Sequence, residues 1–240
     1  MKACELTSLL LKNPYPGRGI MMGLTPDAGS ALVAYFIMGR SENSQNRVFV
    51  SDGAALNIKA HDLSKIKDPS LIFYHPQLEH ENSLILTNGD QTDTIYEGLK
   101  QGSSAEDALF TRCHEPDAPH FTPRISGVLD MVSGDFMLAL LRASDEKGES
   151  CDRLFYHYPA RPGFGRFIHT YEGDASPLPS FTGEPRAVTV PQDSEAFAKD
   201  IWNSLNPDFK VALFVREISL SDRTSKVFVY NRHQGGQSDA

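Results

Sequence analysis

The chain has 240 residues, of which 40 % are hydrophobic and 22 % are charged. This composition is typical of a globular protein with a real core, and it excludes a chain that is disordered throughout. The formal net charge of −8 argues against non-specific binding to nucleic acid, because proteins that do so are usually basic. An anionic small ligand is not excluded, since a few arginines can converge in one cleft of an acidic protein.

The N-terminal region and the cysteines indicate a cytoplasmic protein. The apolar run at residues 9–11 is too short for the core of a signal peptide, and no stretch reaches the length of a membrane helix. Cys4, Cys113 and Cys151 are far apart, odd in number and without a CxxC pair. They predict reduced thiols, not a disulfide framework or a zinc site. We therefore expect no membrane partner and no metal.

Strand signals dominate the chain. Residues 18–24 and 30–38 are apolar runs that flank a turn sequence, so they predict a hairpin. A second hairpin is predicted for residues 125–132 and 136–142, which Ser-Gly-Asp joins. Further strands are expected at residues 48–51, 71–74, 84–87, 153–158, 166–171, 211–218 and 226–231.

Helices are fewer, and they are predicted for residues 91–100, 104–113 and 193–205. The last of these is the clearest, because Phe197, Ile201 and Leu205 recur every four residues. Antiparallel hairpins with a handful of helices indicate an α+β fold, and the lack of an alternating βαβ pattern disfavours a doubly wound nucleotide-binding fold.

The chain is expected to form one domain over residues 1–233. The polar, Gly-rich residues 234–240 indicate a frayed, disordered tail. Residues 174–191 hold four prolines and few large apolar residues, so they indicate a long surface loop or lid whose role is open.

Two arginine-bearing segments are candidates for binding an anion. The first, Asn13-Pro-Tyr-Pro-Gly-Arg-Gly, brings Arg18 to the start of a strand, although a plain strand-entry turn with a surface arginine is the commoner meaning of such a segment. The second runs from Gly39 to Arg47 and carries Arg40 and Arg47, whose planar forks suit phosphate oxygens. Its neutral candidates are Ser41, Ser44 and Asn46. A solvated loop is the alternative interpretation.

The third segment, residues 87–94, runs from a strand into a helix start, where free N–H groups favour anions. The side chains of Asn88 and Gln91 can read an amide or a base edge. Asp90 and Asp93 are also explained as helix caps, and capping accounts fully for at least one of them.

The fourth segment, residues 115–124, is the best candidate for acid–base work. Three prolines hold it extended, and it brings Glu115, Asp117, His120 and Arg124 together. A rigid loop with ordinary surface charges is the alternative. Tyr74, at the end of a predicted strand, is a candidate for the same cleft or simply a core tyrosine.

Together these segments resemble the archaeal-type IMP cyclohydrolase family and its bacterial relatives. The matching sequences are YPGRG at 15–19, GRS at 39–41 through NR at 46–47, TNGDQTD at 87–93, and EPDAP at 115–119 through TPR at 122–124. The resemblance implies a four-layer αββα sandwich like that of the N-terminal-nucleophile hydrolases, with mostly antiparallel sheets. It does not imply their chemistry, because Met1 is followed by Lys2 and no nucleophile stands at the terminus.

The reaction that the resemblance implies closes 5-formamidoimidazole-4-carboxamide ribonucleotide to IMP with loss of water, without a cofactor. Under this hypothesis Arg18, Arg40 and Arg47 contact the phosphate or the oxyanion. Under the same hypothesis Asn88 and Gln91 hold the carboxamide. Either Glu115 or Asp117 moves the proton, and Tyr74 assists. Asn46 and Arg124 also bind the substrate.

Three functions are therefore open. The first is the cyclohydrolase, whose only expected partner is a purine ribonucleotide. The second is a non-catalytic purine-nucleotide-binding protein, which would keep the arginines and tolerate loss of Glu115. The third is a related hydrolase of amides or cyclic amidines, including one whose terminus is processed to Cys4. The exact substrate, the choice between the two carboxylates and the formation of a homo-oligomer are left open.

Overall fold

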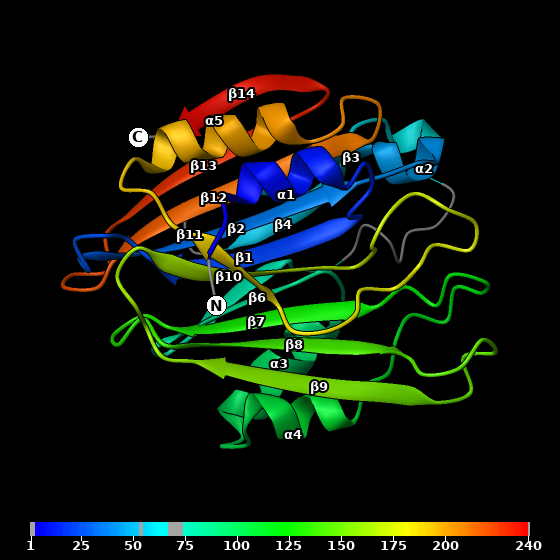
Figure 1. Cartoon of the computed structure of the whole chain (residues 1–240), viewed down its shortest axis with the longest axis horizontal. Helices are drawn as coiled ribbons and strands as arrows, with labels where there is room; N and C mark the ends of the chain where they lie inside the picture. The colour runs from blue at the N-terminus through cyan, green and yellow to red at the C-terminus, as the bar shows by residue number, and fades with distance from the viewer. Residues whose placement is uncertain (1–2, 53–54, 67–73, 240) are drawn as a thin grey trace.

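The computed structural model describes residues 3–52, 55–66 and 74–239, and for residues 234–239 only the backbone. Two seven-stranded sheets face each other, and neighbouring strands within each sheet run antiparallel over these residues (Figure 1). The first sheet has the order β11 (Arg186–Thr189), β10 (Phe164–His169), β1 (Arg18–Leu24), β2 (Ser30–Met38), β12 (Lys210–Ser219), β13 (Ser225–Asn231) and β14 (Gln234–Asp239). The second has the order β3 (Arg47–Ser51), β4 (Leu56–Ala60), β5 (Gln77–His80), β6 (Ser83–Thr87), β7 (Arg124–Asp130), β8 (Phe136–Ala143) and β9 (Cys151–Tyr158).

Helices cover the outer faces of both sheets. The first sheet is covered by α1 (Leu6–Lys12) and α5 (Ser194–Ser204), and the second by α3 (Gln91–Lys100) and α4 (Ala105–Phe110) (Figure 1). A one-turn helix, α2 (Glu42–Gln45), connects β2 to β3, and a short 3₁₀ turn covers Leu63–Lys65. The result is a mixed fold of two antiparallel sheets with few helices, which confirms the α+β prediction. Across the described residues, no helix is long and apolar enough to cross a membrane.

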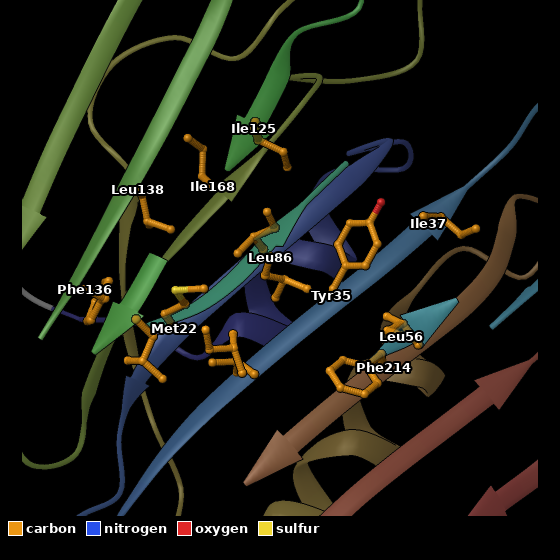
Figure 2. Packing of buried hydrophobic residues seen from close by; sticks show 14 of the residues in the cluster. Met22, Tyr35, Ile37, Leu56, Leu86, Ile125, Phe136, Leu138, Ile168 and Phe214 are labelled. Carbon is orange, nitrogen blue, oxygen red and sulfur yellow. The ribbon is translucent and has the colours of Figure 1, made fainter. Parts of the chain in front are cut away.

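The apolar runs in the sequence arise because central strands are buried on both faces. Along β2, Val33 and Tyr35 point between the sheets, whereas the alternate residues Leu32 and Phe36 point to the helices. Figure 2 shows Tyr35 beside Leu86 of the opposite sheet, in the cluster to which Val33 also belongs. Two buried faces explain why β2 is continuously hydrophobic and does not alternate with polar residues.

Most predicted elements are present, with changes at their ends. The strands at 18–24 and 30–38 and the helix at 91–100 have the predicted bounds, whereas the helix predicted for 104–113 ends at Phe110. The predicted strand at 71–74 lies outside the described residues except for Tyr74, which is not in a strand. The sequence did not predict α1, α2, β4, β5 or β11.

The two segments expected to be irregular carry strands. Residues 186–189, within the predicted loop 174–191, form β11 and pair with β10. Residues 234–239, for which a frayed tail was expected, pair with β13 as the edge strand β14. Both lie at sheet edges, where unpaired backbone groups accept a further strand whatever its side chains.

Candidate functional site

The candidate site lies where the ends of β1, β6, β7 and β10 meet the segment before β7. Arg18 begins β1, and its backbone N–H donates to Thr170 Oγ1, just after β10, at 3.1 Å. Arg124 begins β7, and Asn88 follows β6 and accepts the Ile125 N–H at 2.8 Å. Strand ends that are remote in sequence therefore bring the predicted segments together.

Two arginines and a group of tyrosines form one wall. The guanidinium of Arg18 lies within electrostatic range of Tyr15, Tyr35, Tyr74 and Tyr171, and that of Arg47 within range of Arg18. Burial lowers the pKa of Arg47, and the Arg18 charge lowers it further. In Arg18 burial also lowers the pKa, but the four tyrosines outweigh it and the net direction is upward. Both arginines stay charged at neutral pH and make this wall attractive to an anion.

Arg47 is buried with one unsatisfied group. It is 1 % exposed, and its Nε donates to the Ser44 carbonyl of α2 at 2.8 Å. Its Nη2 atom has no hydrogen-bond partner among the residues that the structure describes. A buried charged donor without a partner is costly, so an anionic ligand at this point would repay that cost.

Tyrosine hydroxyls link this wall to the segments that precede β5 and β7. The hydroxyls of Tyr35, on β2, and Tyr74 lie 3.1 Å apart. The Tyr171 hydroxyl lies 2.5 Å from Thr122 Oγ1, which in turn bonds a carboxylate oxygen of Asp117. The predicted residue Tyr74 is thus at the site, together with three tyrosines to which the sequence analysis assigned no role.

The two candidate carboxylates are held differently. Both oxygens of Asp117 accept hydrogen bonds from Thr122, one from its backbone N–H at 2.6 Å and one from its hydroxyl. Asp117 therefore fixes the shape of the loop before β7. Glu115 pairs instead with Arg124, at 2.8 Å to Nη1 and 3.0 Å to Nη2, and 29 % of its side chain is exposed.

Burial raises the pKa of Glu115, and this effect outweighs its arginine partners. Arg124 opposes the rise most, Asp90 and Asp117 add to it, and Arg18 opposes it weakly. A carboxyl group whose pKa is moved toward neutrality can both accept and return a proton. Of the two candidates, Glu115 has the environment of an acid–base group.

The predicted amide residues are engaged inside the protein. Asn88 donates to the Pro123 carbonyl at 2.9 Å and accepts from Gln91 at 2.9 Å. Gln91 also donates to the Ile125 carbonyl and accepts from Arg124 at 2.7 Å. These bonds give both amides the role of holding the start of β7. Contact of either with a carboxamide ligand stays a prediction.

Three other predicted residues have partners of their own. Arg40 pairs with Asp174 at 2.9 Å and lies over the Tyr15 ring, so it ties the loop after β10 to the arginine wall. The Asn46 amide bonds the backbone of Asp62 in both directions at 2.8 Å, which staples two loops. The Cys4 thiol donates to the Ala187 carbonyl of β11. Direct ligand contacts of Arg40 and Asn46 likewise stay predictions.

Comparison with known proteins identifies the family. A sequence model of the IMP cyclohydrolase-like proteins matches residues 15–223. The chain belongs to the IMP cyclohydrolase-like family. It is 33 % identical over 125 residues to a protein of Methanopyrus kandleri named IMP cyclohydrolase, covering 48 % of this chain and 59 % of that protein. It is 32 % identical over 137 residues to a protein of the same name from Methanothrix thermoacetophila, covering 55 % of this chain and 64 % of that protein.

The family match, over residues 15–223, contains every residue placed at the site. The site residues missed by sequence reasoning are Tyr15, Tyr35, Thr122 and Tyr171. Tyr15 and Thr122 stand inside the quoted motifs, so the motifs themselves were the available signal. Tyr35 and Tyr171 stand in apolar strand sequence, and there a site tyrosine cannot be told from a core tyrosine.

Proposed function

We propose that this protein is an IMP cyclohydrolase that closes 5-formamidoimidazole-4-carboxamide ribonucleotide to IMP with loss of water. One observation carries the proposal: a half-buried carboxyl group, Glu115, is clamped by Arg124 beside the cationic wall of Arg18 and Arg47. Membership of the family and the name of the two archaeal relatives support the same function.

The cationic wall accounts for binding of a purine ribonucleotide. Arg18 and the unsatisfied Nη2 of Arg47 would donate hydrogen bonds to the phosphate or to the oxyanion that develops on the formyl oxygen. Arg40 stands beside Tyr15 and would close the site from the side of the loop after β10.

Glu115 would serve the ring closure itself. The carboxamide nitrogen attacks the formyl carbon and loses a proton to the base, and the formyl oxygen takes up a proton to become a hydroxyl. This hydroxyl is then protonated and departs as water, while a second N–H proton of the new ring is lost as the C=N bond forms. A weak amide nucleophile needs a base for the first proton and an acid for the departing water. A carboxyl group of raised pKa can do both in turn, and Tyr74, whose hydroxyl meets Tyr35, would hold the oxygen.

The test is the turnover of IMP or its formylated precursor, followed by absorbance, in the wild-type protein and in Glu115→Gln. We expect kcat to fall by about 10²-fold or more in the variant, with IMP affinity within a few fold of wild type. Glu106→Gln is the matched control, because Glu106 of α4 pairs with His157 of β9 at 2.8 Å and, among the described residues, with no arginine of the site. Its kinetics should equal those of wild type.

The alternatives give other results. Tight IMP binding without turnover in the wild-type protein would indicate a nucleotide-binding protein that is not an enzyme. Equal turnover in Glu115→Gln would remove Glu115 from the reaction. If neither binding nor turnover is found, the substrate proposal is wrong, and amides or other cyclic amidines should be tried next.

We also propose the finer fold assignment, a four-layer αββα sandwich related to the N-terminal-nucleophile hydrolases. Two facing antiparallel sheets with helix pairs on their outer faces support it. Superposition of an experimental structure on that fold class tests the assignment. A different strand order in the two central sheets would overturn it.

A further inference from the structure

Asp90 precedes helix α3 but does not cap it. The sequence explains an aspartate at this position as an N-cap, yet its side chain makes no capping hydrogen bond and its backbone is already helical. The carboxylate pairs instead with Arg112, from the segment after α4, and with Arg124 at 2.6 Å. Capping therefore does not explain why an aspartate stands at position 90. Its role must be sought in its contacts with the two arginines.

Arg124 divides its guanidinium between Asp90 and Glu115. Its Nη1 atom lies 2.6 Å from Asp90 Oδ1 and 2.8 Å from Glu115 Oε1, while its Nε donates to the Cys113 carbonyl at 2.9 Å. Gln91 Oε1 accepts from the same Nη1. The Arg124 side chain is only 7 % exposed, and these acceptors occupy most of its N–H donors. Few donors therefore remain for a substrate.

The charges that face Glu115 come from four elements. Arg124 of β7 and Arg18 of β1 are positive, whereas Asp90 before α3 and Asp117 of its own loop are negative. Asp90 acts in two ways: it repels the Glu115 carboxylate, and it draws on the same Nη1 atom that stabilises that carboxylate. Arg112 counters Asp90 from the outer side. The Glu115 side chain is 29 % exposed and that of Asp90 is 56 % exposed, so solvent screens part of the repulsion but not the contact that both carboxylates make with Arg124 Nη1.

We infer that Asp90 is a positioning residue that, through the guanidinium it shares with Glu115, sets the pH at which Glu115 exchanges its proton. Arg112 sets the strength of this effect by holding Asp90 from outside. The inference rests on the proposed function, in which Glu115 is the acid–base residue. In this inference Asp90 and Arg112 act through Arg124 and not by contact with the substrate.

The experiment compares the pH dependence of kcat in the wild type, Asp90→Asn and Arg112→Gln. The relevant limb is the one that Glu115→Gln abolishes. Asp90→Asn should move this limb to lower pH by about half a unit or more, because a repelling charge is lost and Arg124 is left to Glu115. Arg112→Gln should move it to higher pH, because the charge of Asp90 is no longer offset. Opposite shifts cannot come from a general loss of stability.

A second readout does not depend on turnover. The side-chain carboxyl ¹³C signal of Glu115, assigned by its loss in Glu115→Gln, should titrate with the same two shifts. Glu97→Gln removes a carboxylate from the far end of α3, where it pairs with Lys100, and should match wild type in both measurements.

The outcomes separate the two proposals. If wild type has no cyclohydrolase turnover, the proposed function fails while the ¹³C titration still tests the role of Asp90. If wild type turns over but neither variant shifts, or both shift in one direction, the inference is overturned. If Asp90→Asn fails to fold in thermal melts, the upward shift in Arg112→Gln decides alone.

Discussion

Position 17 requires glycine because of its backbone conformation and its close neighbours. It has a φ of 75°, in the left-handed region, and a Cβ atom there would overlap Thr170 Oγ1 and the Tyr171 ring. Gly102, with a φ of 79° and no atom within 4 Å of its Cβ position, has the same backbone constraint in open space. Close packing behind Arg18 therefore requires glycine at position 17.

We expect Gly17→Ala to lose about 3 kcal/mol or more of unfolding free energy, and Gly102→Ala about 1 kcal/mol. The difference measures the overlap with Thr170 and Tyr171, because the backbone strain is common to both. Urea unfolding of the two variants gives both values. Since Thr170 holds the Arg18 backbone, Gly17→Ala should also weaken IMP binding, and Gly102→Ala should not. Equal losses of stability in the two variants would contradict this account.

At the scale of elements, the polar residues after β2 build a helix. Ser41 caps α2: its Oγ accepts from the Ser44 N–H at 3.1 Å, and Ser44 Oγ accepts from the Ser41 N–H at 3.0 Å. The sequence predicted these hydroxyls as neutral ligand donors, but the capping box engages both. The helix in turn presents the Ser44 carbonyl to Arg47. The segment therefore acts by positioning an arginine.

Ser41→Ala and Ser104→Ala form a matched pair, because each serine caps one short helix. We expect each to cost about 1 kcal/mol of unfolding free energy. Affinity for IMP should fall by less than about threefold in Ser41→Ala and stay unchanged in Ser104→Ala, as judged by calorimetric titration. A tenfold or greater loss confined to Ser41→Ala would show that its hydroxyl contacts the ligand directly.

How far the sequence predicts the elements depends on length and partners. Long strands buried on both faces, such as β2, and helix α3, which is ten residues long, were predicted with the correct bounds. The helix α1 was missed because Glu5 offers no side-chain cap, and β4 because five residues, LNIKA, carry little pattern. Such elements are stabilised by the sheets and helices around them, and a single sequence does not contain that information.

For the whole molecule, the segments of the site were predictable but their division of labour was not. The motifs named Glu115, Arg124 and Arg18 together, and the fold brings them into one electrostatic cluster. The choice of Glu115 over Asp117 needed the contact with Thr122, and the role of Asp90 needed its partners Arg112 and Arg124. Side-chain pairing across two sheets is a tertiary property, so turn and motif patterns cannot supply it.

The stability of the whole fold should depend on pH through His169, at the end of β10. Its ring stacks on Phe167 and meets Phe181 edge-on, while its Nδ1 lies 2.9 Å from the Tyr171 carbonyl. Burial lowers the pKa of His169 to about 4 from the usual 6.5. As the pH falls below 6.5 the unfolded chain takes up a proton that the folded protein refuses, so stability is lost until about pH 4. Exposed aspartates of lowered pKa, such as Asp27 and Asp145, add losses only below the ordinary aspartate range.

We therefore expect the free energy of unfolding to fall by about 3 kcal/mol across this window, since each pKa unit is worth about 1.4 kcal/mol. Urea unfolding at several pH values between 7.5 and 4 measures the slope of the unfolding free energy against pH. His169→Gln cannot take up a proton and should flatten it, whereas His157→Gln, at an exposed histidine, should keep it. A slope that His169→Gln leaves unchanged would assign the acid sensitivity to the ion pairs around Arg124 instead.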